Sequence, residues 1–282
     1  MNDTERLAQF VHDNPRLFVL SGAGISTASG IPDYRDRDGA WKGARPVEYR
    51  DFVGKPYVRQ RYWSRSMLGW PRMAYSQPNV CHRSVAWLQQ AGYVERIVTQ
   101  NVDSLHQRAG ATDVIDLHGR LDSATCLNCG TTYARDDWQG RIEALNPNFA
   151  ATVQSVREAP DGDAVLEGVD YASFVVPDCD QCGGIVKPDV VFFGENVPRP
   201  RVAAAMDALA ASDALLVLGS SLIVFSGFRF AREADRLGRP IALLNLGFNR
   251  ADDLATLKLD APCEDVLREL PAQLSASPRR SA

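Results

Sequence analysis

The sequence predicts an α/β protein with a doubly wound parallel sheet and a smaller second domain. Short apolar runs with strand character alternate with helical stretches, which is the pattern of parallel βαβ units. The first apolar run ends in a glycine-containing turn at residues 21–24, a typical start of a nucleotide-binding sheet. Two regions, at about 43–75 and 121–187, interrupt the alternation, and we expect them to be insertions that together build the smaller domain.

The elements follow in order along the chain. We expect strands at residues 17–20, 96–99, 114–117, 190–193, 214–218 and 240–244. Helices are expected at residues 80–91, 104–109, 201–211, 227–237 and 264–270, and another should begin near Ser26. The resulting domain boundaries are 1–42, 76–120 and 188–274 for a Rossmann-like domain, 43–75 and 121–187 for the small domain, and 275–282 for a disordered tail.

Composition narrows the class of protein. The chain has 282 residues, of which 45% are hydrophobic and 23% charged, as in ordinary soluble domains. Its net charge of −4 argues against binding to nucleic acid through bulk positive charge. The N-terminus lacks a signal-peptide pattern, and no apolar run reaches membrane-spanning length. We therefore expect a cytoplasmic protein with neither a nucleic-acid nor a membrane partner.

Four of the six cysteines form two C-x-x-C pairs, each followed by glycine: Cys126 with Cys129, and Cys179 with Cys182. This spacing lets two thiolates of a pair reach one ion, and four cysteines complete a tetrahedral zinc site. Because protein ligands occupy all four positions, the zinc ion should be structural. Disulfides or separate redox pairs are the alternative, which an intracellular location disfavours.

Polar or small residues follow five of the expected strands. They lie at residues 21–24, 100–103, 118–119, 219–221 and 245–247. Ligands of open α/β sheets bind outside the carboxyl ends of the strands, so these residues predict a polar cleft. The glycines alone are weak evidence, because Thr27 occupies the place of the third glycine of the dinucleotide fingerprint and no acidic ribose anchor follows. From them alone, a tight turn without a ligand is equally possible.

Several motifs follow one another from about residue 5 to 270. They are GAGIS at 22–26, GIPDYR at 30–35, TQNVD at 99–103, LHG at 117–119, KPDVVFFGE at 187–195, GSS at 219–221, Asn245 and the cysteine pairs. In this order the chain resembles the sirtuin family. Tyr34 and the QRYW segment at 60–63 resemble its class II branch, which includes mitochondrial members.

The resemblance implies an NAD-dependent protein-lysine deacylase. NAD would be consumed as a co-substrate, giving nicotinamide and O-acyl-ADP-ribose. The cofactor-binding residues implied are Gly22, Ala23, Gly24, Ile31, Asp33, Tyr34, Arg35, Gln100, Asn101, Asp103, Gly219, Ser220, Ser221, Asn245, Gly247 and Cys263. Asn and Asp side chains can together donate to and accept from a nicotinamide carboxamide.

His118 is the residue we expect to act in catalysis, together with Asn101. Its imidazole can transfer protons near neutral pH. A lone histidine is more often a buried structural residue, but the polar cleft and the family pattern favour a general base. The implied reaction begins when the acyl-lysine oxygen attacks the ribose carbon that carries nicotinamide. His118 then takes a proton from a ribose hydroxyl, and water finally releases the lysine.

An acyl-lysine peptide would add as a strand between residues 191–195 and 221–224. The implied substrate-binding residues are Tyr62, Arg65, Val191, Phe193, Gly194 and Glu195. Tyr62 and Arg65 lie three apart on an expected helix, and family members that remove acidic acyl groups use a Tyr-x-x-Arg pair to bind the carboxylate. We therefore hypothesise a preference for larger or acidic acyl groups. The alternative is that Arg65 is a surface residue packed on an aromatic neighbour.

Three other functions fit parts of the pattern. A protein mono-ADP-ribosyltransferase would use the same cleft with a protein side chain as acceptor. A nicotinamide oxidoreductase is disfavoured by the missing third glycine and ribose acid. A non-catalytic zinc-ribbon module that binds nucleic acid is disfavoured by the acidic charge balance.

Overall fold

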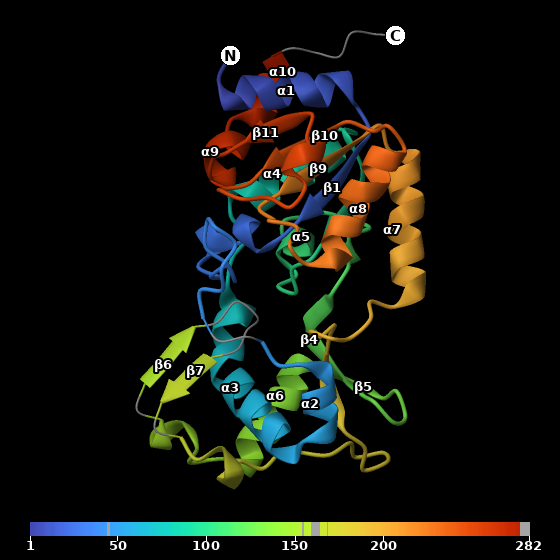
Figure 1. The fold of residues 1–282 in the computed structure, drawn as a ribbon. Coiled ribbons are helices and arrows are strands. Elements are labelled where there is room, and N and C mark those ends of the chain that lie inside the picture. The colour runs from blue at the N-terminus through green and yellow to red at the C-terminus, as the bar shows by residue number, and fades with distance from the viewer. Residues whose placement is uncertain (44–45, 154, 159–163, 168, 277–282) are drawn as a thin grey trace.

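The main sheet has six parallel strands in the order β11-β10-β9-β1-β2-β3. The computed structural model describes residues 1–282 except 44–45, 154, 159–163, 168 and 277–282 (Figure 1). The strands are β1 (Leu17–Ser21), β2 (Val94–Thr99), β3 (Ile115–Asp116), β9 (Ala214–Leu218), β10 (Ile241–Leu244) and β11 (Leu257–Leu259). Because the chain continues to opposite sides of β1, the sheet is doubly wound, and the predicted fold class is confirmed.

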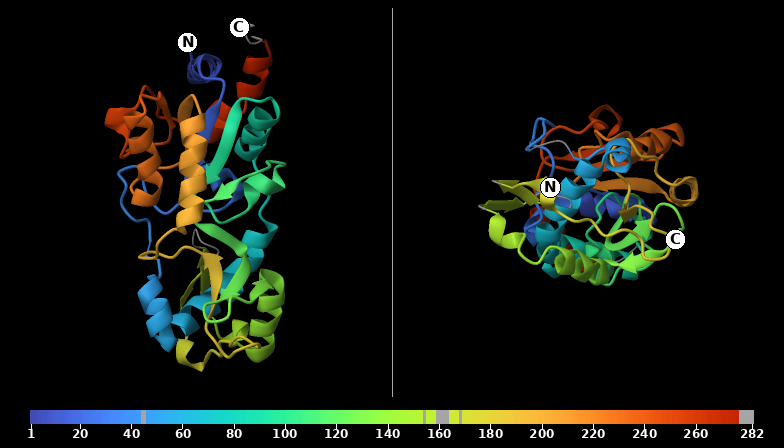
Figure 2. Two further views of the ribbon diagram at one scale, coloured as in Figure 1. Left: turned by 90° about the vertical axis from the view of Figure 1, so that its right-hand side faces the viewer. Right: turned by 90° about the horizontal axis from the view of Figure 1, so that it is seen from below.

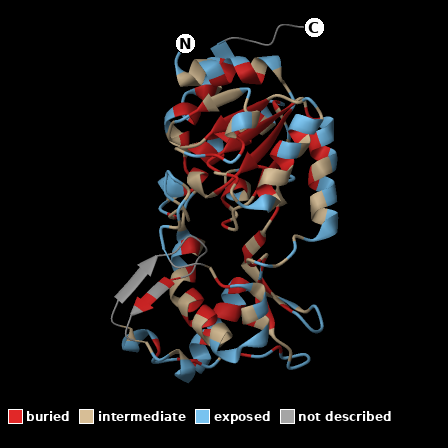
Figure 3. Ribbon diagram, viewed as in Figure 1, coloured by how far each residue is buried: buried red, intermediate tan, exposed pale blue. Residues whose placement is uncertain are grey.

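Strand β1 shows why these runs are continuously apolar. All five of its residues are buried, and successive side chains point to opposite faces of the sheet. Leu17 and Val19 join one hydrophobic cluster, whereas Phe18 and Leu20 join another on the other face. A parallel sheet covered on both faces has no polar face, so its strands read as unbroken apolar runs. Figure 3 shows the sheet as the buried centre of this part of the molecule.

Helices cover both faces of the sheet (Figure 2). One cluster holds residues of α1 (Asp3–Asp13), α4 (Val80–Gln90), α9 (Cys263–Leu267) and α10 (Leu270–Ala276). The other holds residues of α7 (Arg199–Ala211) and α8 (Phe225–Arg236), where the rings of Phe18 and Phe230 lie 5.4 Å apart. Within the described residues, none of the helices has the length and apolar character that crossing a membrane requires.

A smaller assembly lies below the sheet in Figure 1. Its antiparallel sheet has the order β5-β4-β8, formed by β4 (Gly119–Cys126), β5 (Thr132–Ala134) and β8 (Val186–Val190). Its helices are α2 (Tyr49–Gly54), α3 (Pro56–Tyr75) and α6 (Arg135–Leu145), and a hairpin is formed by β6 (Ser155–Glu158) and β7 (Ala164–Glu167). Trp63 and Trp138 are fully buried in its own core, with ring centroids 5.6 Å apart.

The remaining elements are short. They are α5 (Leu105–Arg108) and the single-turn 3₁₀ helices Ala23–Ile25, Thr27–Ser29, Ala150–Thr152, Tyr171–Ser173 and Asp252–Leu254. The helix expected to begin near Ser26 is therefore wrong, because only two separate turns form there. Gly30 adopts a left-handed conformation with φ of 82°, and Pro32 follows, so the second turn cannot continue into a helix.

The strand expected at 190–193 is also wrong. The paired segment is β8, which ends at Val190 and lies antiparallel to β4 in the small sheet. An apolar run indicates a strand but not its partner, so the sequence could not show that this one belongs to the smaller sheet. Ser275 and Ala276, predicted as part of a disordered tail, belong to α10, and residues 277–282 lie outside the described residues.

Leu216 tests the packing of the main sheet. It is 0% exposed in β9, between β1 and β10. Replacement by alanine leaves a cavity, so we expect Leu216→Ala to lower the free energy of unfolding in urea by about 3 kcal/mol. Leu145→Ala is the matched control, because Leu145 ends α6 with 48% exposure and should change stability by less than about 0.5 kcal/mol. Equal losses in the two variants would contradict this assignment of the core.

Candidate active site

A cavity of about 620 Å³ opens at the carboxyl ends of the parallel strands. Five strands each contribute a lining residue just after they end: Gly22 after β1, Gln100 after β2, His118 after β3, Gly219 after β9 and Asn245 after β10. The polar strand ends singled out in the sequence therefore lie around one cavity. This is the location at which open α/β sheets bind ligands.

Most of the site residues expected from the sequence line this cavity. They are Gly22, Ala23, Gly24, Ile31, Asp33, Tyr34, Arg35, Tyr62, Gln100, Asn101, Asp103, His118, Val191, Phe193, Gly194, Glu195, Gly219, Ser220, Ser221, Asn245 and Cys263. Arg65 and Gly247 do not line it. A Cβ atom at Gly247 would lie 2.3 Å from the carbonyl oxygen of Arg37, so this glycine permits a close approach of two loops.

Gly24 and Gly219 bring the loops after β1 and β9 into backbone contact. The amide of Gly24 donates to the carbonyl of Gly219 at 2.8 Å. A Cβ atom at Gly219 would lie 2.4 Å from the amide nitrogen of Ile25, and one at Gly24 would lie 2.9 Å from the Cα of Gly219. Gly219 also has a φ of 59°, which disfavours other residues. The glycines thus serve the packing of the two loops as well as access to the cavity.

Asn101, Ser26 and Asp103 form a connected polar group in the cavity wall. The amide nitrogen of Asn101 donates to the Ser26 hydroxyl at 3.0 Å and to the carbonyl of Gly22 at 3.1 Å. The Ser26 hydroxyl donates to the Asp103 carboxylate at 2.6 Å. Burial raises the pKa of Asp103, while the hydrogen bond from Ser26 opposes the rise. An amide and a carboxyl held side by side can recognise the carboxamide of a ligand.

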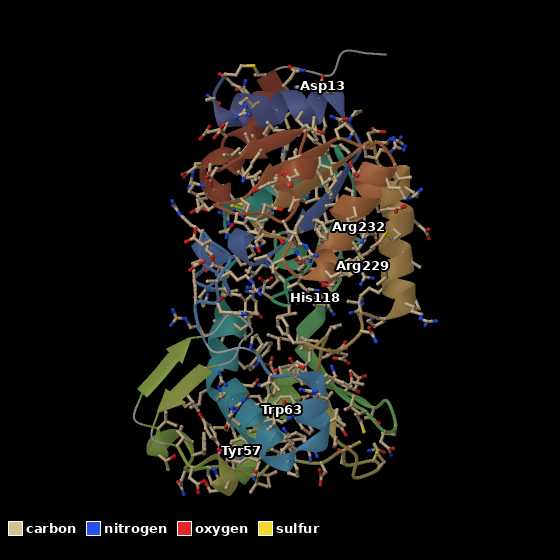
Figure 4. All side chains as sticks on the ribbon, in the orientation of Figure 1. Asp13, Tyr57, Trp63, His118, Arg229 and Arg232 are labelled. Atoms are coloured by element: carbon tan, nitrogen blue, oxygen red, sulfur yellow. The ribbon has the colours of Figure 1, made fainter. Side chains whose placement is uncertain are left out.

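His118 is held as a neutral base. Its Nδ1 lies 2.9 Å from the carbonyl oxygen of Gln100, and because a carbonyl only accepts, Nδ1 carries the proton. Nε2 is then the unprotonated nitrogen, and it accepts a hydrogen bond from the Ser226 hydroxyl at 2.8 Å. Burial lowers the pKa of His118 to about 4, and the positive charges of Arg201 and Arg229 add to this effect. Figure 4 shows His118 between the main sheet and the smaller assembly.

Two buried histidines contact serine hydroxyls in and beside the polar group formed by Asn101, Ser26 and Asp103. The rings of His82 and His106 meet edge to face at 5.1 Å. Nε2 of His82 lies 3.4 Å from the Ser26 hydroxyl, and Nε2 of His106 lies 2.8 Å from that of Ser21. Burial lowers the pKa of these histidines to about 2 and about 4. His82 also forms a helix-capping pair with Asn79 at the start of α4.

The loop at residues 191–195 is fixed by a partly buried ion pair that the sequence did not reveal. The Lys187 ammonium lies 3.2 Å from the Glu195 carboxylate, which also accepts from the amide of Phe192 at 2.8 Å. Lys187 is 7% exposed, and burial lowers its pKa. The amide of Val191 donates to the carbonyl of His118 at 2.7 Å. The carboxylate of Glu195, expected to bind substrate, thus holds the shape of the loop beside His118.

Tyr62 and Arg65 are not brought together at the cavity. Tyr62 is buried against Phe52 and Phe192 and lines the cavity. The guanidinium of Arg65 instead donates to the carbonyl of Ala164 in β7. Helical spacing correctly places both residues on α3, but it could not show that the hairpin β6–β7 would lie against Arg65.

Cys126, Cys129, Cys179 and Cys182 form one cluster, with all four sulfur atoms within 4.8 Å of one another. Two of the sulfur pairs lie 3.5 and 3.7 Å apart. Tetrahedral coordination at about 2.3 Å per bond places sulfurs about 3.8 Å apart, so the cluster fits one zinc ion. The ion would join the turn after β4 to the segment before β8, two chain segments that are far apart in sequence.

Comparison with known proteins gives a consistent result. The model of the Sir2 family matches residues 22–226. An NAD-dependent protein deacetylase of Bordetella bronchiseptica is 53% identical over 96% of this chain and 98% of its own length. NAD-dependent protein deacetylase 2 of Bradyrhizobium diazoefficiens is 52% identical over 93% of this chain and 96% of its own length.

Solved structures extend the likeness to three dimensions. A structure described as Sir2 with a p53 peptide and NAD⁺ covers 98% of this chain and 100% of its own, with a TM-score of 0.78 at 30% identity. The fold and the cavity define a protein built to hold a dinucleotide at a doubly wound sheet. This chain belongs to the Sir2 family.

Three histidines with lowered pKa values should make folding stability depend on pH. His82, His106 and His118 have folded-state pKa values of about 2, 4 and 4, whereas the unfolded chain takes up protons near pH 6.5. The unfolded state therefore binds more protons below pH 6.5, and stability is lost as the pH falls toward the folded values. Between pH 7 and 5 we expect a loss on the order of 2 kcal/mol per histidine in urea unfolding.

His118→Ala provides the control for this prediction. It removes one of the three titrating groups, so its loss between pH 7 and 5 should be about a third smaller than that of the wild type. Asp103 and Asp116, whose pKa values are raised by burial, oppose the loss, but they are common to both proteins. Identical pH dependence in the two proteins would show that the folded protein does not hold His118 in its neutral form.

Metal content tests the cysteine cluster. We expect elemental analysis of the purified protein to find about one zinc ion per chain. Cys126→Ser should lose most of this zinc and lower the melting temperature, because the cluster joins distant segments. Cys81→Ser is the matched control, since Cys81 is equally buried but lies outside the cluster, and it should keep its zinc. Full zinc content in Cys126→Ser would refute the assignment.

Proposed function

We propose that this protein is an NAD-dependent protein-lysine deacylase that acts on acetyl-lysine and releases nicotinamide and O-acyl-ADP-ribose. One observation carries the proposal. His118, with its neutral Nε2 beside the Ser226 hydroxyl, lines the same cavity as Asn101, Asp103 and the glycine turns after β1 and β9. The relatives named above as NAD-dependent protein deacetylases support it over nearly the full chain.

NAD would lie across the ends of the strands. The turn at Ala23 and Gly24 lines the cavity, and the pyrophosphate would lie against its backbone. The carboxamide of nicotinamide would exchange hydrogen bonds with Asn101 and Asp103, beside the side chain of Ile31. Ser220, Ser221 and Asn245 would line the adenosine end.

His118 would act on the ribose. The acyl oxygen of the substrate attacks the ribose carbon as the bond to nicotinamide breaks. Nε2 of His118 then takes the proton of a neighbouring ribose hydroxyl, whose oxygen attacks the imidate carbon, and water completes release of the lysine amine. The Ser226 hydroxyl that now donates to Nε2 marks the position from which the ribose hydroxyl would donate. A base with a pKa near 4 is unprotonated at neutral pH and ready to accept.

The peptide would lie between the loops 191–195 and 221–224, both of which line the cavity. Main-chain pairing with these loops would hold the lysine stem between Val191 and Phe193 without specifying the surrounding sequence. The ion pair of Lys187 with Glu195 supports this role, because it keeps the first loop in place beside His118.

Mass spectrometry of an NAD reaction with an acetyl-lysine peptide tests the proposal. The wild type should form nicotinamide, free lysine peptide and O-acetyl-ADP-ribose, and His118→Ala should reduce turnover by about 10²–10⁴-fold because the base is lost. His12→Ala is the matched control, since His12 lies on α1, and it should retain wild-type turnover.

Two outcomes would contradict the proposal, the first for the role of His118 and the second for deacylation itself. Turnover by His118→Ala within about twofold of wild type would remove His118 from the chemistry. Transfer of label from adenine-labelled NAD onto protein, without loss of the acetyl group, would instead assign the cavity to a mono-ADP-ribosyltransferase.

A further inference from the structure

Arg229 is a cation of the cavity wall that the chemistry proposed above does not use. It lies on α8 three residues after Ser226, whose hydroxyl contacts His118, so the two side chains lie on neighbouring positions of one helix face. Both residues line the cavity. In Figure 4 Arg229 lies on the end of α8 nearest to His118, and Arg232 lies further along the helix, away from it.

Arg229 has no acidic partner among the described residues. It forms none of the ion pairs found there, and its half-buried side chain keeps a buried Nε without an acceptor. Glu233, one turn further along α8, pairs with Arg236 at 2.6 Å. The guanidinium carbon lies 5.4 Å from the centroid of the Phe225 ring, which holds the side chain without neutralising it. A partly desolvated cation of this kind favours a ligand that carries a negative charge.

Two of the other described cations that line the cavity, Arg35 and Lys42, have side-chain contacts within their own loop. Arg35 donates to the carbonyl of Gly39 and lies 3.9 Å from the centroid of the Trp41 ring. Lys42 pairs with Asp33, and Arg37 is exposed on the same loop. Arg229, by contrast, lies on α8 and lines the part of the cavity nearest to His118 (Figure 4). Its charge reaches His118, since it contributes to the low pKa of that histidine.

We propose that Arg229 binds a carboxylate of the acylated substrate and makes the enzyme prefer substrates that carry one near the acyl-lysine. The carboxylate has two possible sources, the end of a dicarboxylic acyl chain or an acidic side chain of the peptide beside the lysine. Arg suits this role because its planar guanidinium can form two parallel hydrogen bonds to a carboxylate. The inference rests on the proposed deacylase function, and it places the recognition of acidic groups on α8 rather than at Arg65.

Three peptides separate the two sources. The first carries acetyl-lysine among neutral residues, the second carries acetyl-lysine flanked by glutamate, and the third carries glutaryl-lysine among neutral residues. The ratio of kcat/KM for each acidic peptide to that for the neutral peptide is measured for wild type, Arg229→Ala and Arg229→Lys. Arg232→Ala is the matched control, because Arg232 is exposed on the same helix and does not line the cavity.

We expect wild type to favour at least one acidic peptide. Arg229→Ala should lower the ratio of kcat/KM for that peptide to kcat/KM for the neutral peptide by about tenfold or more, the size of one charge-assisted hydrogen bond. Arg229→Lys should keep part of the preference, Arg232→Ala should keep all of it, and added salt should weaken it. Loss confined to the glutaryl peptide assigns the carboxylate to the acyl chain, and loss confined to the glutamate peptide assigns it to the flanking sequence.

Other results overturn the inference. Equal effects of Arg229→Ala on all three peptides would make Arg229 a structural residue, and a wild type without preference would leave it no role in recognition. Loss of the preference in Arg65→Ala but not in Arg229→Ala would return carboxylate binding to α3. If wild type releases nicotinamide from NAD with none of the three peptides, the proposed deacylase function itself fails. If wild type turns over the neutral peptide and one of the results in this paragraph is found, only the role of Arg229 is refuted.

Discussion

The backbone contact between Gly24 and Gly219 is the constraint on which the rest of the site depends. These residues follow β1 and β9, neighbouring strands at which the order of the sheet reverses, and neither position has room for a Cβ atom. The two turns that the contact joins both line the cavity. A larger residue at Gly219 would separate the turns, and the polar strand ends would no longer surround a single cavity.

The cavity also depends on polar groups that are buried and yet hydrogen-bonded. Ser26 is the centre of this arrangement, since its hydroxyl contacts Asn101, Asp103 and His82. Burying any one of these polar groups without a partner would be unfavourable. Together they form hydrogen bonds with one another, which hold them in a single geometry. The same burial that keeps His118 neutral and available as a base also makes the protein sensitive to acid. Chemistry and stability are thus linked through the same side chains.

Much of the fold was predictable because it follows from local patterns. The strands that enter the main sheet are unbroken apolar runs bounded by glycine or polar residues. The two C-x-x-C pairs indicate the metal ligands by their spacing in the sequence alone. The failures have a common cause. The strand expected at 190–193 lies at 186–190 and belongs to the smaller sheet. The helix expected at Ser26 is only a turn that ends at Gly30. Neither outcome could be read from the sequence, because pairing partners and loop contacts are not local properties.

The amino-acid sequence by itself determined which residues follow the strands and that they share one edge of the sheet. The reason is that the carboxyl ends of parallel strands always lie at the same edge. Only the tertiary structure decided how the charged side chains are used. Glu195 pairs with Lys187, Arg65 contacts the carbonyl of Ala164, and Arg229 lines the cavity near His118. These outcomes depend on contacts between segments far apart in the chain, and a charge has no assigned partner until folding brings one within a few ångströms.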